Sequence, residues 1–196
     1  MRAKKTSYQD LIQFIQTQTG YSYFKSRTIL KELSKLLNEK VGKGFAIECE
    51  GLFAVDFNLS GMINSNAEYF GIEEQAKELS ERLGFPLIDV FNVLKLYYNK
   101  IKSDVESGFQ VNVKSVGYII PKEDKNGAIY LDARISPQLK KPEIADFIVL
   151  DTNGDFKVTM VEKDKLRLSI LLDSELQLPY RLIDNSENRA VQYIEL

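Results

Sequence analysis

The sequence predicts an α+β fold in which two tandem units, each of two helices and a short β-sheet, form a pseudo-dimer followed by a small all-β extension. The same order of elements occurs twice, over 8–55 and 72–120. Glycines recur at a spacing of 64, which matches Gly20 with Gly84 and Gly44 with Gly108. A unit of roughly 50 residues has little core of its own, so two copies gain by packing together. We expect units at 1–70, 71–141 and 142–196.

The first unit shows each element in turn. A short amphipathic helix ends at Gly20, and Ser22 caps a longer one whose apolar face, beginning at Phe24, points inward. Residues 45–50 alternate apolar and polar side chains, which indicates a half-buried strand. A turn and a return strand follow. We expect a polar loop over 58–66, without a basic arm.

The second unit repeats this order with clearer boundaries. Pro86 suits the first turn of the long helix, whose inner face begins at Ile88. Residues 109–113 alternate cleanly, 116–120 return, and 124–127 carry a hairpin-turn signal before a strand over 128–135. This alignment places a two-residue deletion in the first copy, so that its turn glycine, Gly51, matches Gly117.

The C-terminal third contains strand patterns only. It holds 6 Lys and Arg against 11 Asp and Glu, a net charge of −5. Its size is near the limit for independent stability, so its strands pack on the tandem units or pair with a neighbouring chain through exposed edges. The strands are expected at 144–150, 156–161, 166–172, 176–183 and 190–194. The expected assembly contacts are Leu166, Leu168, Ile170, Leu176, Leu178 and Tyr180.

Composition excludes several kinds of catalytic site. The chain has one cysteine, Cys49, and no histidine, so a Cys/His zinc site, a serine–histidine triad or a cysteine–histidine pair cannot form within it. The acids around 151–155 superficially resemble a calcium loop, but the full pattern is missing and a plain hairpin is favoured. We therefore expect no enzyme activity, no cofactor and no metal. No apolar run reaches membrane-spanning length and no signal-peptide pattern follows Met1, so we expect no membrane association.

Charge also bears on nucleic-acid binding. Residues 1–70 hold 9 Lys and Arg against 7 Asp and Glu, and residues 71–141 hold 11 against 10. Neither unit has the strongly basic surface expected of a nucleic-acid binder. The basic N-terminal residues Arg2, Lys4 and Lys5 are interpreted as a frayed terminus rather than an arm.

Several stretches carry a family resemblance. Residues 76–84, Asp89-Val90, 108–113, 116–119 and 136–141 resemble the HU/IHF family of DNA-bending proteins in order and type. The first copy is similar as far as Val55. The family works as an intertwined dimer of such units, so the resemblance implies a pseudo-dimer within one chain.

The departures from that family concern DNA contacts. HU and IHF hold DNA with long basic arms that carry a wedge proline. Residues 122–127 are short and charge-neutral, and 58–63 contain no basic arm, so no DNA-contacting residue is carried over. A solvated rim is favoured over residual DNA contacts for one set of cations: Lys114, Lys122, Lys125, Arg134, Lys140 and Lys141. Tyr97-Tyr98 and Tyr21-Ser22-Tyr23-Phe24 are likewise interpreted as core or interface rather than base-stacking residues.

Two functions remain. The favoured one is a structural assembly protein that uses the HU/IHF fold for protein–protein contacts. HU/IHF-like proteins occur among the virion structural proteins of some tailed phages, including crAss-like phages, and the resemblance implies a ring component of a tail or neck, in the virion after assembly in the bacterial cytoplasm. Its partners would be copies of itself and other structural proteins, with duplex DNA bound weakly or not at all. The alternative is an architectural DNA-binding protein of the HU/IHF type.

Overall fold

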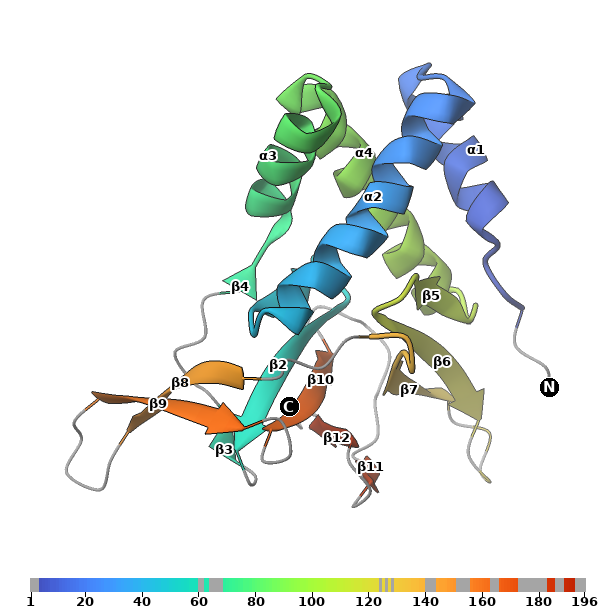
Figure 1. Ribbon diagram of the computed structural model, residues 1–196. Helices are drawn as coiled ribbons and strands as arrows, with labels where there is room; N and C mark the ends of the chain where they lie inside the picture. The colour runs from blue at the N-terminus through green and yellow to red at the C-terminus, as the bar shows by residue number, and fades with distance from the viewer. Residues whose placement is uncertain are drawn as a thin grey trace.

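The computed structural model describes residues 4–59, 62–63, 69–123, 125, 127 and 129–139, and strands within 144–150, 156–162, 166–172, 183–185 and 189–192. The fold is α+β, with the helices gathered at one end and the strands at the other (Figure 1). The helices are α1 (Tyr8–Thr19), α2 (Tyr23–Gly42), α3 (Ile72–Leu83) and α4 (Leu87–Glu106). The strands are β1 (Ala46–Cys49), β2 (Phe53–Leu59), β3 (Met62–Ile63), β4 (Tyr69–Phe70), β5 (Val111–Val113), β6 (Gly117–Glu123), β7 (Ile129–Ile135), β8 (Ile144–Leu150), β9 (Phe156–Glu162), β10 (Leu166–Leu172), β11 (Ile183–Asn185) and β12 (Arg189–Gln192).

The helices repeat in length and in the way they end. α1 and α3 each have 12 residues, and α2 and α4 each have 20. The short helices end at Gly20 and Gly84, whose φ angles of +71° and +68° lie in the left-handed region. That region favours glycine because a Cβ atom would crowd the following carbonyl. We call α1, α2, β1 and β2 the first half, and α3, α4, β5, β6 and β7 the second half.

The strands keep the same spacing as the helices. β2 and β6 each have seven residues, and their first residues, Phe53 and Gly117, are 64 apart. The turn before β2 is closed by a hydrogen bond from the Leu52 amide to the Cys49 carbonyl (2.9 Å). The turn before β6 has the corresponding bond, from the Val116 amide to the carbonyl of residue 113 (3.0 Å). Both turns are therefore built in the same way.

This spacing corrects the alignment made from the sequence. Gly51 and Ser115 occupy the same turn position, and both have a φ of +66°. The expected match of Gly51 with Gly117, and the two-residue deletion it required, are therefore wrong. The sequence misled because a glycine is the usual residue at a positive φ, and here the second copy places a serine there.

The two halves are intertwined. α1 packs against α4, and α3 packs against α2. The segment before α1 crosses to the second half, where Lys5 pairs with Gln110; the segment before α3 crosses to the first half, where Tyr69 pairs with Ala46 in β1. α2 and α4 contact each other and contribute to one core cluster. The shared core expected from the repeat is confirmed.

The sheets are unequal. The strands of the first half, β1 and β2, belong to a seven-stranded sheet of order β11-β12-β10-β2-β1-β4, with β3 paired to the far end of β2. The second half has the three-stranded sheet β5-β6-β7, and β8 and β9 form a two-stranded sheet. The expected loop over 58–66 is corrected at its start, because β2 continues to Leu59 and β3 follows. The C-terminal strands β10, β11 and β12 join the first half, one of the two arrangements expected of them.

Some sequence predictions lie outside the described residues. These are the hairpin at 151–155, most of the strand expected at 176–183, and the residues Lys140, Lys141, Leu176, Leu178 and Tyr180.

A buried polar network ties the two halves together inside the core. Gln75 of α3 is fully buried and donates hydrogen bonds to the carbonyls of Glu48 (2.7 Å) and Phe70 (2.9 Å). The Tyr98 hydroxyl of α4 donates to Gln75 Oε1 (2.9 Å). The side-chain amide thus joins β1 and the strand before α3 to both helices of the second half.

Replacing Tyr98 by phenylalanine should destabilise the protein by about 1–3 kcal/mol, because Gln75 Oε1 loses its donor in a site without water access. Urea unfolding measures the change. Tyr23→Phe removes the same hydroxyl from a side chain that is 42% exposed and should cost less than about 0.5 kcal/mol. Equal losses in the two variants would contradict a role for the network.

Candidate functional site

Four exposed apolar side chains lie at the starts of the two long helices. They are Phe24 (74% exposed), Ile88 (64%), Leu87 (51%) and Tyr23 (42%), and we call them the helix-start patch. Tyr23 and Leu87 are 64 residues apart, as are Phe24 and Ile88, so both halves expose the same two positions. Both helix starts lie at the end of the molecule opposite the strands (Figure 1).

The expectation that Phe24 and Ile88 face inward is wrong. The chain enters each long helix from a tight glycine turn, so the first turn of α2 and of α4 stands at the end of the helical layer. The apolar spacing of each long helix continues into its first turn, although the short helix before it has already ended. The signal available in the sequence was the recurrence of two adjacent apolar residues directly after a helix cap.

An ion pair joins the two helix starts. Lys25 Nζ lies 2.6 Å from Asp89 Oδ2, and the Tyr21 hydroxyl donates to Asp89 Oδ1 (2.6 Å). The Lys25 ammonium also lies over the rings of Tyr21 (4.2 Å) and Phe85 (5.5 Å). Hydrogen bonds from Lys25 and Tyr21 lower the pKa of Asp89, so its carboxylate stays charged. A fixed polar contact therefore joins the residues that directly follow Phe24 and Ile88.

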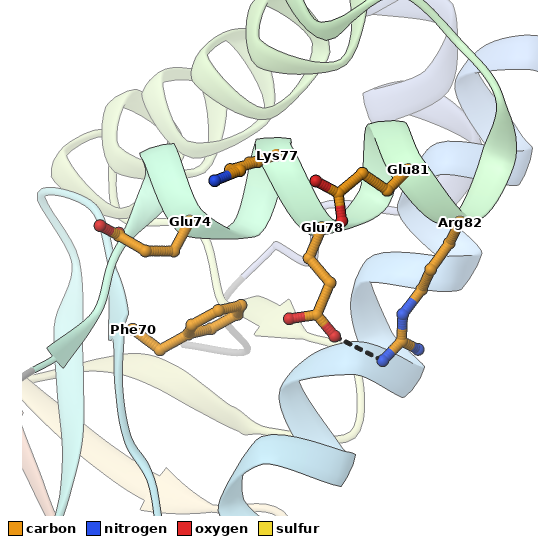
Figure 2. Close-up of a pocket in the computed structure, with 6 residues that line it drawn as sticks. All are labelled: Phe70, Glu74, Lys77, Glu78, Glu81 and Arg82. Carbon is orange, nitrogen blue, oxygen red and sulfur yellow. Dashed lines mark hydrogen bonds and ion pairs between the residues drawn. The ribbon is translucent and has the colours of Figure 1, made fainter.

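A charged hollow lies on the outer side of α3, with a volume of about 630 Å³. Figure 2 shows its lining residues projecting from α3, with Phe70 below them. They are Phe70, Glu74, Lys77, Glu78, Glu81 and Arg82.

One acid of this hollow, Glu78, joins Glu39 of α2 in a set of ion pairs between α3 and α2. Arg82 contacts Glu39 (2.8 Å) and Glu78 (2.7 Å), and Lys40 contacts Glu78 (2.6 Å). Burial works to raise the pKa of Glu78, but hydrogen bonds and charge from Lys40 and Arg82 outweigh it and lower that pKa. The hydrogen bond from Arg82 lowers the pKa of Glu39. A carboxylate held ionised in this way is a poor proton donor. These ion pairs therefore serve to clamp α3 to α2.

The described cations suggested as residual DNA contacts all lie in or next to the β5-β6-β7 sheet. Lys122 and Arg134 both pair with Asp132, which is 2% exposed. Lys114 directly follows β5, and its ammonium lies over the ring of Tyr8, 5.5 Å from the ring centroid. Lys125 lies in the turn after β6, and Lys140 and Lys141 are outside the described residues. Of the described members, ion pairs bring together Lys122 and Arg134, with an acid between them.

The expected assembly contacts are placed only in part. Leu166, Leu168 and Ile170 lie in β10, which has β2 on one side and β12 on the other. The expectation of a free edge is therefore corrected in part, because β2 pairs with the whole of β10 and β12 pairs with its residues 169–171. Contact of these residues with a neighbouring copy stays a prediction.

Two further predictions concern aromatic and metal-binding residues. Tyr97 and Tyr98 are buried, which confirms the core interpretation. Within the described part of the chain, no group of three or more Cys, Asp or Glu residues could hold a metal ion. Nor is any described helix both long and apolar enough to cross a bilayer.

Comparison with known proteins adds no family: no protein-family model matches the chain, and no curated protein matches it.

The clamp on α3 should make stability depend on pH. The pKa values of Glu39 and Glu78 are lowered on folding, so their stabilisation is complete above the ordinary value of 4.5 and lost as pH falls through the folded values. Arg82→Met should lower stability at pH 7 by about 0.5–1 kcal/mol, because exposed pairs are screened by solvent. The loss should shrink towards pH 3.

Thermal unfolding of Arg82→Met between pH 7 and pH 3 measures this effect. Lys77→Met is the matched control, since it removes a cation from the same hollow and helix. A loss in Arg82→Met that stays constant down to pH 3 would show that the carboxylates do not carry it.

Proposed function

We propose that this chain is a structural assembly protein that uses an HU/IHF-like pseudo-dimer for protein–protein contacts, as a ring component of a phage tail or neck. The observation that carries the proposal is the helix-start patch. Exposed apolar side chains that recur at both helix starts, next to a fixed ion pair, are typical of an interface core with a polar element that sets orientation. A first-turn Phe that is 74% exposed contributes little to folding.

The charges support protein partners over DNA. A DNA interface that neutralises 6–10 phosphates needs that many cations on one face. Lys122 and Arg134 share the buried carboxylate of Asp132, which offsets one of their two charges within the hairpin. Arg82 and Lys40 are likewise engaged between α2 and α3. Little unbalanced positive charge is left on these elements for phosphate.

The intertwined halves support the family part of the proposal. A short helix, a left-handed glycine, a long helix and an antiparallel hairpin, present twice and crossing over at their first residues, match the dimer that the HU/IHF resemblance implies. The virion and ring assignments rest on that resemblance.

Replacing both Phe24 and Ile88 by serine should weaken self-association at least tenfold while leaving the fold intact, because interface energy concentrates in a few buried apolar anchors. Sedimentation and native mass spectrometry measure the assembly over a range of protein concentrations. Phe45→Ser is the control, since this phenylalanine is 47% exposed but lies outside the patch. If the double variant assembles like the control, the patch is not the interface.

Duplex DNA should bind only weakly and without sequence preference, with a Kd of about 10⁻⁴–10⁻⁶ M near 150 mM salt. Fluorescence anisotropy with a labelled duplex at several salt concentrations tests this. Sub-micromolar binding at that salt would favour the alternative, an architectural DNA-binding protein.

A further inference from the structure

The C-terminal strand β10 completes the sheet of the first half. It runs antiparallel to β2 over the whole of that strand, from Leu166 opposite Leu59 to Leu172 opposite Phe53. Because β10 covers this edge, β1 and β3 share the other edge of β2. The described strand that follows β2, β3, therefore lies on the edge opposite to the one that β10 fills.

The second half fills the same edge with its own return strand. β7 follows β6 after a short turn and pairs with it from Ile129 opposite Glu123 to Ile135 opposite Gly117. Leu59 and Glu123 are equivalent at the spacing of 64, and so are the first residues of β2 and β6. β10 thus occupies on β2, residue for residue, the register that β7 occupies on β6.

The two return strands are tethered very differently. β7 is joined to β6 by residues 124–128, whereas β10 reaches β2 from a point more than 100 residues along the chain. The connection from β7 to β10 runs through β8 and β9, which pair only with each other among the described strands. An isolated two-stranded hairpin is marginally stable in water, so this tether is weakly held.

We propose that β10 is an exchangeable strand: in the assembled protein, β10 of one copy pairs with β2 of a second copy in the register seen here. This rests on the proposed assembly function and names its connector. A strand taken from a neighbour makes the same contacts as a strand of the chain itself, so exchange costs little beyond opening the tether. The segment 136–165 has about 30 residues and spans up to roughly 100 Å when extended, enough to reach an adjacent copy.

Exchange explains two other features of the C-terminal region. β12 pairs with β10 at residues 169–171 and β11 pairs with β12, so the three strands move as one block that covers part of the outer edge of β10. The region has a net charge of −5 and the first 70 residues +2, which favours its approach to the first half of any copy.

Engineered cysteines in the full-length chain test the exchange. Asn58 and Arg167 are cross-strand partners, and so are Phe57 and Leu168. Both pairs are needed because neighbouring antiparallel pairs alternate between wide and close spacing. The natural thiol of Cys49 does not interfere, since it is fully buried and burial raises its pKa.

The decisive sample contains two single-cysteine variants, Asn58→Cys and Arg167→Cys, co-expressed with different tags and oxidised after purification. Disulfide-linked dimers that carry both tags are expected if β10 is exchanged, together with the oligomer in sedimentation. The control is the equivalent pair of the second half, Lys122→Cys with Tyr130→Cys, whose short turn prevents exchange. It should give no mixed dimers.

The outcomes separate the two proposals. An oligomer without mixed disulfides in either cysteine pair, while Asn58→Cys/Arg167→Cys in one chain forms its disulfide internally, overturns exchange and leaves the assembly function standing. A protein that remains monomeric at every concentration overturns both. Mixed dimers in the β2–β10 pair alone support exchange.

Discussion

The crossing of each half over the other is the contact on which the rest of the structure depends. Neither half encloses its core alone, because each short helix packs against both long helices and each leading segment joins the other half. The Thr6 hydroxyl, just before α1, donates to Asp104 near the end of α4 (2.8 Å). This crossing brings the starts of α2 and α4 together and so creates the helix-start patch. It also sets the two sheets close enough for β10 to pair with β2 while lying beside β7.

Fusing the two halves in one chain allows contacts that two identical copies cannot make. Lys25 and Asp89 are equivalent by the spacing of 64, and they meet across the junction of the halves at 2.6 Å. In a dimer of identical units, the residue at this position would face its own copy, so a lysine would meet a lysine and a carboxylate a carboxylate. Because the two positions carry different residues in this chain, an attractive pair stands where identical units would repel each other. The same freedom explains why Tyr21 holds Asp89 while its equivalent, Phe85, has no hydroxyl to do so.

Local patterns in the sequence predict local structure well and long-range pairing poorly. The long helices expected from Ser22 and Pro86 begin one residue after each. The strand expected over 166–172 is present with those bounds. The apolar residues of this strand could not identify β2 as its neighbour, because period-two alternation predicts a strand but not the strand with which it pairs. The two-residue strand at Tyr69 is too short to give any pattern. The exposure of Phe24 and Ile88 escaped prediction because helical periodicity does not show where the neighbouring helix ends.

The position of β10 also sets the order in which the sheet can form. The helices and the β5-β6-β7 sheet use contacts made within the first 135 residues, whereas the outer edge of β2 waits for the last third of the chain. Closing so long a loop costs more entropy than the turn that brings β7 to β6, so the pairing of β10 forms late. Until then, β2 presents a row of unpaired amides and carbonyls that will accept any strand of matching register. During synthesis at high local concentration, the strand that arrives first can belong to a neighbouring copy. The second half has no such interval, because β7 follows β6 directly. This difference separates the two sheets: one is closed by the next strand of the chain, and the other is closed only by a strand from the last third of the chain.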